Sequence, residues 1–446
     1  MSVSDGRPVT GVVDQLPTLD TLHARARRLA DDSGGRVGWS SMGSSRLGED
    51  LGVLTVGEGG RHAVVLAGVH PNEPIGGLTA LALAEQLSND QGLARDLGYT
   101  WHIAVCVDPD AMRLNEEWLG RPLSRTRYER YFYRPASAEQ VEWTFPLTTD
   151  GYVFDKPLPE TMAMMRLIDG VKPDVLASLH DCEMGGAYFY LSRPEPSLYP
   201  VLTKICAGAG VPMDLGKPEG ENDESFAPGI FKFGHPSEAA ARGMDLAAEW
   251  GTGSSSIHYA QKYGALGIIP EVPMWRNTEF GDRTVASVNS HQARLDAGNS
   301  LVQRGELLES VIDQLDAFEL LDTPVSRAAR SLVPTVATHG RELLAARENA
   351  DDGPITVGEL ASLQAFVLKH SKRFGSLLVR AMDIEILAGL APRGVRDLAN
   401  GLRVQVQRWG DDVDEGAAWQ SVPIDSLVEV QVKAVIAAAR TASHCR

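Results

Sequence analysis

The sequence of 446 residues has few cysteines, no long apolar run and no excess of positive charge. Its four cysteines, at positions 106, 182, 206 and 445, show no Cys-x-x-Cys or Cys-x-x-His spacing, so a disulfide framework is not expected. No apolar stretch is long enough to cross a bilayer. The net charge of −17 makes nucleic acids and anionic membranes unsuitable partners.

The cell compartment and the size of the core follow from the same composition. The first seven residues lack the basic region and apolar core of a secretory signal. Together with the cysteine pattern, this predicts a cytoplasmic protein. Hydrophobic residues make up 43% of the chain, which is enough for a substantial core, and the length allows either several domains or one large domain with an appendage.

Short apolar runs that favour strands alternate with segments of helical periodicity in the first part of the chain. The expected strands are 51–56, 63–69, 101–107, 175–179 and 267–269, and the expected helices are 19–29, 75–87 and 159–168. A turn is expected at 40–45. The alternation predicts an α/β fold with a mixed, largely parallel sheet flanked by helices.

The pattern of apolar residues changes near residue 286. Apolar residues then follow helical spacing, and Thr356 and Glu359 form a capping-box pattern at the start of one such segment. The best strand candidate in this part is 402–406. We therefore expect a catalytic domain at 1–285 and a mainly helical C-terminal domain or extension at 286–446.

Side chains capable of chemistry follow the predicted strands. His70 and Glu73 come after the strand 63–69, His180 follows 175–179, Glu271 follows 267–269, and a polar segment at 108–113 follows 101–107. Because ligands bind at the carboxyl ends of strands in such sheets, we expect these side chains to meet at one edge.

A hydrolytic zinc site needs three protein ligands and one open position for water. A single histidine is more often structural, but His70, Glu73 and His180 each stand at a predicted strand end. They are therefore candidates to hold one Zn²⁺ per chain. Glu271 is the candidate for the base that activates the water, with a salt-bridged structural glutamate as the alternative.

These residues resemble, as an ordered set, the M14 zinc carboxypeptidases. The family motif His-x-x-Glu stands here as His70 to Glu73, a distant histidine ends a strand as His180 does, and a late glutamate follows an apolar strand as Glu271 does. The segment 108–110 resembles the family's Asn-Pro-Asp turn, with Asp108 in place of the asparagine. The resemblance covers roughly residues 15–285 and implies a zinc carboxypeptidase-like fold.

The resemblance also implies roles in substrate binding. Arg113 and Asn115 resemble the motif whose arginine stabilises the oxyanion, and Arg130 resembles the arginine that clamps the substrate's terminal carboxylate. Arg134 is the second candidate for the clamp. The segment 253–258 resembles the specificity pocket, where Ile257 favours a neutral or apolar side chain.

Three functions are open at this point. The first is a metallocarboxypeptidase that removes a C-terminal residue from a peptide or peptide-like substrate bearing a carboxylate. The second is a zinc-dependent deacylase acting on N-acyl amino acids or a related small molecule, as in relatives within the wider family. The third is a zinc-free binding or scaffold protein. The helical region is expected to pack on the catalytic domain; covering the mouth of the site and supporting a homo-oligomer are the alternatives.

Overall fold

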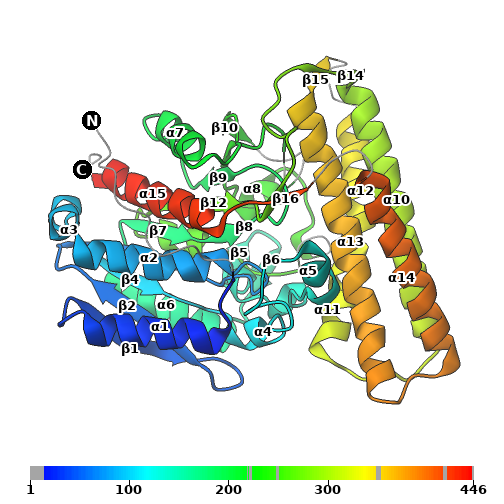
Figure 1. The fold of residues 1–446 in the computed structure, drawn as a ribbon, viewed down its shortest axis with the longest axis horizontal. Coiled ribbons are helices and arrows are strands. Elements are labelled where there is room, and N and C mark those ends of the chain that lie inside the picture. Colours follow the sequence, from blue (N-terminus) through cyan, green and yellow to red (C-terminus); the bar gives the residue numbers. More distant parts are fainter. Residues whose placement is uncertain are drawn as a thin grey trace.

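The computed structural model describes residues 15–217, 219, 224–247, 251–347, 353–414 and 419–443. Figure 1 shows an α/β part built on one large sheet, beside a group of long helices from the second half of the chain. The last helix leaves this group and returns to the sheet.

The large sheet is mixed, with parallel strands at its centre. Its order is β1-β2-β4-β3-β7-β12-β9-β11-β10, and β8 also pairs with β12. Strands β4, β3, β7 and β12 run parallel to one another, whereas β1, β2, β9 and β10 form antiparallel pairs with neighbours. The bounds are β1 Val37–Ser44, β2 Asp50–Val56, β3 Arg61–Leu66, β4 Tyr99–Ala104, β7 Val175–Ser178, β8 His180–Asp181, β9 Tyr188–Leu191, β10 Ser225–Ala227, β11 Ile230–Lys232 and β12 Leu266–Val272. The predicted fold class is confirmed.

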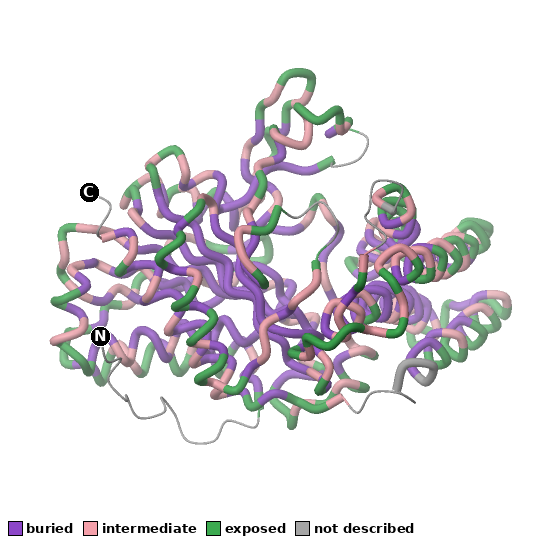
Figure 2. The backbone as a smooth tube through the Cα atoms, turned by 90° about the horizontal axis from the view of Figure 1, so that it is seen from above, coloured by how far each residue is buried: buried purple, intermediate pink, exposed green. Residues whose placement is uncertain are grey.

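Both faces of the central strands are covered by helices, which explains why these strands are apolar along their whole length. Along β3, Ala63 and Val65 belong to one apolar cluster, and Val64 and Leu66 belong to another on the opposite face. Figure 2 shows the buried backbone concentrated in these strands. The first face carries α1 (Leu19–Asp32), α2 (Ile75–Asn89), α7 (Tyr199–Ala209) and α15 (Ile424–Ser443), and the second carries α6 (Pro159–Val171) and α9 (Ser256–Gln261).

The long helices of the second half pack mainly against one another. Close approach of α10 and α12 depends on glycine, since a Cβ on Gly305 would lie 2.4 Å from the backbone nitrogen of Ala337. A capping box at Thr356 and Glu359 begins the longest helix, as predicted. The helices are α10 (Ser290–Leu315), α11 (Pro324–Leu332), α12 (Pro334–Arg347), α13 (Val357–Leu387) and α14 (Arg393–Asp414).

Shorter elements complete the fold. They are α3 (Gln91–Leu97), α4 (Pro109–Arg113), α5 (Arg125–Tyr131), α8 (Pro236–Ala241), the two 3₁₀ turns Ser137–Glu139 and Val141–Trp143, and three two-stranded pairs: β5 (Leu147–Thr149) with β6 (Tyr152–Phe154), β13 (Trp275–Arg276) with β16 (Gln420–Ser421), and β14 (Val285–Asn289) with β15 (Pro354–Thr356). Helix α13 packs against α5 as well as against α10, α11 and α14.

Helix α15 lies on the large sheet, although it comes after the helical group in sequence (Figure 1). It packs against α2, α7 and β12, and its buried stripe includes Leu427, Val430 and Ala434. The boundary near residue 286 stays a prediction, and the final helix belongs spatially with the first part.

Two local predictions were wrong. The segment 40–45, expected to be a turn, lies mostly in strand β1. This strand pairs with β2 and has a register shift between Ser41 and Ser44. The segment 402–406, expected to be a strand, lies inside α14. There Leu402 and Val406 are buried one helical turn apart, whereas Val404 is 51% exposed.

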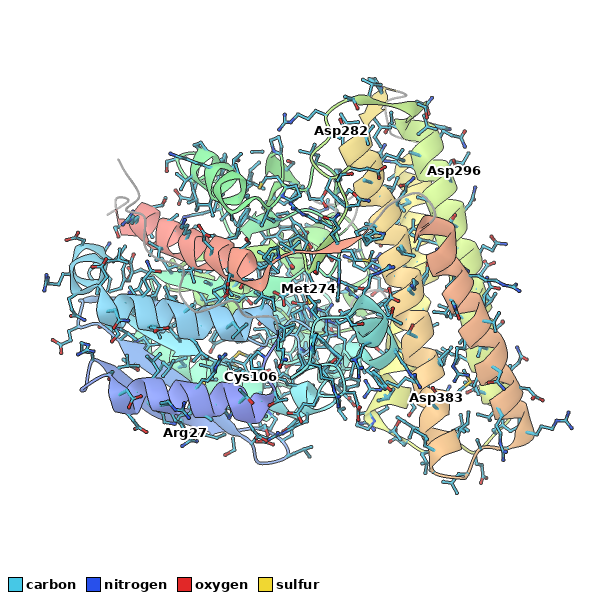
Figure 3. All side chains as sticks on the ribbon, viewed as in Figure 1. Arg27, Cys106, Met274, Asp282, Asp296 and Asp383 are labelled. Atoms are coloured by element: carbon cyan, nitrogen blue, oxygen red, sulfur yellow. The ribbon has the colours of Figure 1, made fainter. Side chains whose placement is uncertain are left out.

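Figure 3 shows how the side chains divide between interior and surface. Cys106 and Met274 lie in the interior, while Arg27 and Asp296 are exposed on the outer helices. The cysteines at 106, 182 and 206 are buried and unpaired with each other. Within the described residues, none of the helices combines the length and apolarity needed to cross a bilayer.

Candidate metal centre and active site

The segment that carries His70 and Glu73 leaves the sheet by a tight turn. Gly68 follows β3 with a φ of 64°, a left-handed conformation that favours glycine, and a Cβ there would lie 3.0 Å from Sγ of Cys106. The chain then turns back, and the backbone N–H of Glu73 donates to the carbonyl of His70 at 3.1 Å. Both side chains are thereby placed at the carboxyl end of β3.

His180 and Glu271 stand opposite each other on paired strands. Strand β8 runs parallel to β12, and Glu271 is the register partner of His180. Next to them, Ser178 ends β7 beside Leu66 of β3. The strand ends expected to meet therefore do meet, and they bring His180 and Glu271 to the His70 turn.

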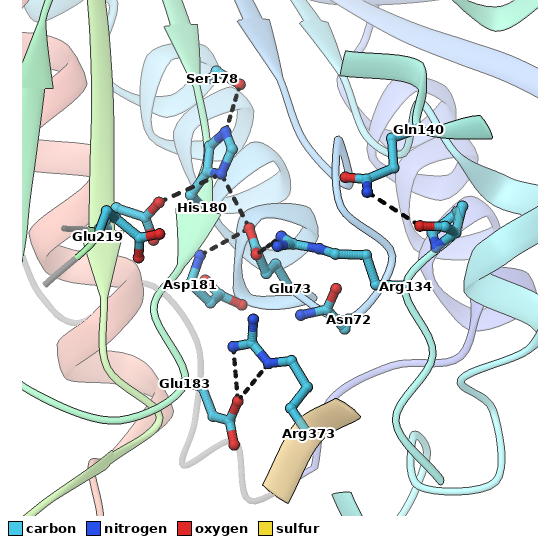
Figure 4. A network of polar contacts seen from close by, with 12 residues as sticks. Asn72, Glu73, Arg134, Gln140, Ser178, His180, Asp181, Glu183, Glu219 and Arg373 are labelled. Atoms are coloured by element: carbon cyan, nitrogen blue, oxygen red, sulfur yellow. Dashed lines mark hydrogen bonds and ion pairs between the residues drawn. The ribbon is translucent and has the colours of Figure 1, made fainter. Parts of the chain in front are cut away.

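The side chains form one compact cluster, drawn in part in Figure 4. Ligand atoms of His70, Glu73 and His180 all lie within 4.8 Å of one another, and all three residues are buried. Nδ1 of His180 is 3.1 Å from Oε2 of Glu73 and 3.5 Å from Oε1 of Glu271. Its other nitrogen, Nε2, lies 3.0 Å from Oγ of Ser178, which fixes the ring orientation.

The cluster has the electrostatics of a cation site. The pKa of His180 is raised to about 9: burial opposes this shift, and the hydrogen bond to Glu73 together with the charges of Glu271, Glu73 and Glu142 produces it. Burial raises the pKa of Glu271 to about 8; His180 opposes this shift and Glu73 adds to it. The carboxylates around His180 therefore stabilise a positive charge at this point, which a metal ion could supply in place of the proton on the ring.

His70 behaves differently from His180. Burial, followed by the positive charges of Arg134, His180 and Arg373, holds its pKa well below the ordinary value, so the ring is neutral at physiological pH. Its Nδ1 is buried and has no hydrogen-bond partner among the described residues. A neutral imidazole nitrogen without a partner, beside a carboxylate and a second imidazole, is suited to hold a divalent metal.

A zinc ion fits this donor set. Two imidazoles and one carboxylate form the three-ligand set that catalytic zinc sites use, with a fourth position left for water or substrate. The unpartnered nitrogen of His70 and the negative potential around His180 both favour binding of a cation. Among the described residues, His70, Glu73 and His180 form the group that could hold one.

The structure pairs the guanidinium of Arg113 with carboxylates other than those of the metal cluster. Its Nη2, Nε and Nη1 pair with Asp20 at 2.7 Å, Glu49 at 2.9 Å and Glu116 at 3.1 Å, and none of its ion pairs involves the metal cluster. The side chain is occupied between α1, α4 and the turn before β2. In this arrangement three of its nitrogens are used by carboxylates, and its role at the oxyanion stays a prediction.

Arg134 does reach the cluster, but it contacts a predicted metal ligand. Its Nη2 makes a close ion pair with Oε1 of Glu73, and this charge counters the effect of burial on the carboxylate, whose pKa stays below its ordinary value. Arg134 thus keeps Glu73 ionised and orients it. The sequence predicted that Arg134 is the second candidate to bind the substrate carboxylate, whereas the contact seen here is with Glu73.

The other three residues predicted to bind substrate make contacts within the protein. Arg130 is exposed, with its guanidinium 5.2 Å from the ring centre of Tyr131. Asn115 is fully buried and ties two segments together, donating to the carbonyl of Tyr133 and accepting from its backbone N–H. Ile257 is 1% exposed and belongs to the apolar cluster under the sheet.

Sequence reasoning missed a cation that α13 contributes. Nε and Nη2 of Arg373 donate to Oε2 of Glu183 at 3.0 and 2.8 Å, and both residues are buried. Glu183 lies three residues after His180, so the C-terminal helices reach the edge of the metal cluster (Figure 4). One helical turn earlier, Nζ of Lys369 pairs with Glu219 at 3.0 Å.

Helix α15 also contacts the cluster, through a residue that the sequence did not single out. Nε2 of the buried Gln431 donates to the carbonyls of His180 at 2.7 Å and Pro270 at 3.3 Å. Its Oε1 accepts from the hydroxyl of Thr79 on α2 at 2.6 Å. Gln431 therefore joins the strand ends of β8 and β12 to α2 behind the metal cluster.

Comparison with known proteins identifies the family that this geometry resembles. Residues 22–202 match the model of the peptidase M14 family, described as zinc carboxypeptidase. The resemblance to M14 zinc carboxypeptidases is thus confirmed over this segment, which contains His70, Glu73 and His180, and it supports a zinc-dependent peptidase. Glu271 and α13 lie beyond the matched residues. No curated protein matches the chain.

Solved structures with partial similarity carry related names. Carboxypeptidase A from Helicoverpa armigera is 14% identical, with 62% of this chain and 69% of that chain covered and a TM-score of 0.41. A metallo-carboxypeptidase from Burkholderia cenocepacia is 15% identical, with 56% and 59% covered and a TM-score of 0.37. At this level of similarity, neither structure bears on the substrate of this chain.

Proposed function

We propose that the chain is a metallocarboxypeptidase that uses one zinc ion to remove a C-terminal residue from a peptide or small peptide-like substrate. The observation that carries the proposal is the buried cluster of His70, Glu73 and His180 with Glu271 at its edge. These three residues would hold the metal, and Glu271 would serve as the base. The M14 match over residues 22–202 supports the same chemistry.

Each group of the site has its own role in this proposed reaction. When bound, zinc supplies a Lewis acid that polarises the scissile carbonyl and makes a bound water more acidic. Glu271 accepts the proton of the attacking water and then delivers it to the leaving amine, so that the carboxylate is regenerated. The charge of Arg134 keeps Glu73 ionised, and Ser178 holds the ring of His180 in place.

A deacylase acting on N-acyl amino acids is the second candidate. It is favoured by the position of α13, whose Arg373 lies close enough to lower the pKa of both His70 and Glu73. A helix this close to the metal cluster would favour a small substrate over a long peptide. Both candidates require a substrate that bears a carboxylate.

The experiment measures metal content and substrate range together. Purified full-length protein should contain about one zinc per chain, and removal of the metal by a chelator should abolish hydrolysis until zinc is added back. Activity should then be compared on N-blocked dipeptides with a free C-terminus and on N-acyl amino acids. Cleavage of the dipeptides supports the carboxypeptidase, whereas cleavage of the N-acyl amino acids alone supports the deacylase. Full activity in metal-free protein would overturn both.

A further inference from the structure

The two arginines that the sequence offers for a substrate carboxylate are Arg130 and Arg134. Arg130 is exposed beside Tyr131, and Arg134 pairs with the proposed metal ligand Glu73. The C-terminal helices bring a further cation to the same site.

Helix α13 carries this cation, Arg373. The side chain is only 6% exposed, and its guanidinium carbon lies over the ring of Phe132, 5.2 Å from the ring centre. Nε and Nη2 are both used by one oxygen of Glu183. In Figure 4 the remaining amino group points away from Glu183, toward the side of the site where Asn72 and Glu73 lie.

Glu183 is held in a way that fixes the direction of this guanidinium. Its φ is 58°, a left-handed conformation that is uncommon for a residue with a side chain. The backbone N–H of Trp275 donates to its carbonyl at 2.9 Å, and the hydroxyl of Tyr128 lies 3.5 Å from Oε2. Strain of this kind is typical of functional sites where the surroundings over-determine the backbone.

A chain of contacts connects this pair to the metal motif. The hydroxyl of Tyr128 also accepts from Nδ2 of Asn72 at 3.3 Å, and Asn72 precedes Glu73. Tyr128 thus joins the Arg373–Glu183 pair to Asn72, the residue before Glu73, and Figure 4 shows Asn72, Glu73, Glu183 and Arg373 close to one another. An arginine with one edge fixed by a protein carboxylate can offer its other amino group to a ligand oxygen without a large loss of side-chain entropy.

We propose that Arg373 of α13 binds the carboxylate of the substrate, with Glu183 as its positioning residue. The inference rests on the proposed function, and it extends that function by assigning the selectivity for an anionic substrate end to the C-terminal helices. Those helices lie outside the segment that matches the M14 family.

The test compares two adjacent cations of α13 in the full-length, zinc-loaded protein. Arg373→Gln removes the proposed substrate contact. Lys372→Gln is the matched control, because Lys372 also pairs with a carboxylate, Glu129 at 2.8 Å, but on the side of α5. We expect Arg373→Gln to raise KM for a substrate with a free carboxylate roughly ten- to hundredfold at nearly constant kcat, as loss of a charged hydrogen bond would do. Lys372→Gln should leave both constants within about twofold of the wild type, because it touches no group of the metal cluster.

A second variant guards against loss of folding. Arg373→Gln alone leaves Glu183 buried and uncompensated, so the double variant Glu183→Gln/Arg373→Gln removes both charges at once. Binding is then measured by calorimetry with N-acetylleucine and N-acetylleucinamide, which require no turnover. The wild type and Lys372→Gln should prefer the acid by roughly tenfold or more, and the double variant should lose this preference.

The outcomes separate this inference from the function on which it rests. If the wild type hydrolyses its substrate and the double variant still prefers the acid, the assignment of Arg373 is overturned and the proposed function stands. If the wild type hydrolyses none of the substrates, the proposed function fails. Even then, an acid preference that is present in the wild type and lost in the double variant would support Arg373 as the group that contacts the carboxylate.

Discussion

The sheet and the C-terminal helices contribute to the same site in different ways. The sheet supplies His70, Glu73, His180 and Glu271 from strand ends, where the order of strands brings them together. The helices supply Arg373 and Gln431, which reach the site only because α13 and α15 dock against the sheet part. Chemistry at strand ends thus depends on topology, whereas the surroundings of that chemistry depend on docking of distant helices.

The largest effect is expected at the strand end that supplies the proposed base. Glu271→Gln keeps the shape of the side chain but removes the proton acceptor, so kcat should fall about 10²- to 10⁴-fold. Zinc content, measured on the same preparation, should not change, because the proposed ligands are intact. Glu160→Gln is a suitable control, since Glu160 is also buried but binds Arg46 instead. Unchanged kcat in Glu271→Gln would exclude this glutamate as the base.

The sheet part also carries a pH-dependent cost at a buried carboxyl group. Asp108 is fully buried, and burial raises its pKa to about 7 against the opposing charge of Arg46. The folded protein therefore retains a proton that the unfolded chain releases above pH about 4, and the free energy of unfolding falls as the pH rises from about 4 to 7. Asp108→Asn, the residue of the family motif, should remove this loss and stabilise the protein by up to about 4 kcal/mol at pH 8.

Urea unfolding at pH 4, 6 and 8 tests this prediction. The difference between Asp108→Asn and the wild type should be small at pH 4 and should grow with pH. A difference that does not depend on pH would show that Asp108 is ionised throughout this range.

A smaller effect is expected from the helices. Gln431→Leu leaves the carbonyls of His180 and Pro270 and the hydroxyl of Thr79 without their present partner. The free energy of unfolding should fall by about 1–3 kcal/mol, and zinc affinity should weaken because the backbone of His180 is no longer fixed. Gln314→Leu on α10, at an exposed position, is the matched control and should change stability by about 0.5 kcal/mol or less. Equal effects of the two substitutions would mean that α15 does not support the site.

The smallest effect is expected for Arg113→Ala. Its three ion pairs are partly exposed, and such pairs contribute about 0–1 kcal/mol each. Steady-state kinetics should show kcat and KM within about twofold of the wild type, since the guanidinium contacts no residue of the metal cluster. A large fall in kcat at full zinc content would support the sequence-based role of Arg113 at the oxyanion.

The contrast between strand ends and docked helices also explains how much of the site the sequence could predict. The positions of His70, Glu73, His180 and Glu271 could be predicted because parallel strand ends share one edge, and an apolar run followed by a polar side chain marks such an end. Arg113 could not be placed from spacing alone. Its partners Asp20 and Glu49 lie far from it in sequence, and nothing local indicates that they will meet it.

Arg373 and the segment 402–406 show the limits for helices. A charged residue inside a helix usually indicates a solvent-facing side, whereas Lys369 and Arg373 are buried against carboxylates of the sheet part. His370, also buried, lies beside His339 of α12. The available signal was the pair of apolar runs, 365–368 and 377–379, on either side of these polar residues. In 402–406, alternating apolar residues fit a strand as well as a helix, and only packing of Leu402 and Val406 decides between the two.

The bond from Gln431 to the carbonyl of His180 has a consequence for synthesis of the protein. These two residues are 251 positions apart, so at about 5–20 residues per second a ribosome needs roughly 10–50 s to add the second after the first. Throughout this interval the nascent chain already carries all three metal-capable side chains, but the strand ends behind them lack the glutamine that joins them to α2. The metal centre can therefore reach its final rigidity only after α15 has left the ribosome.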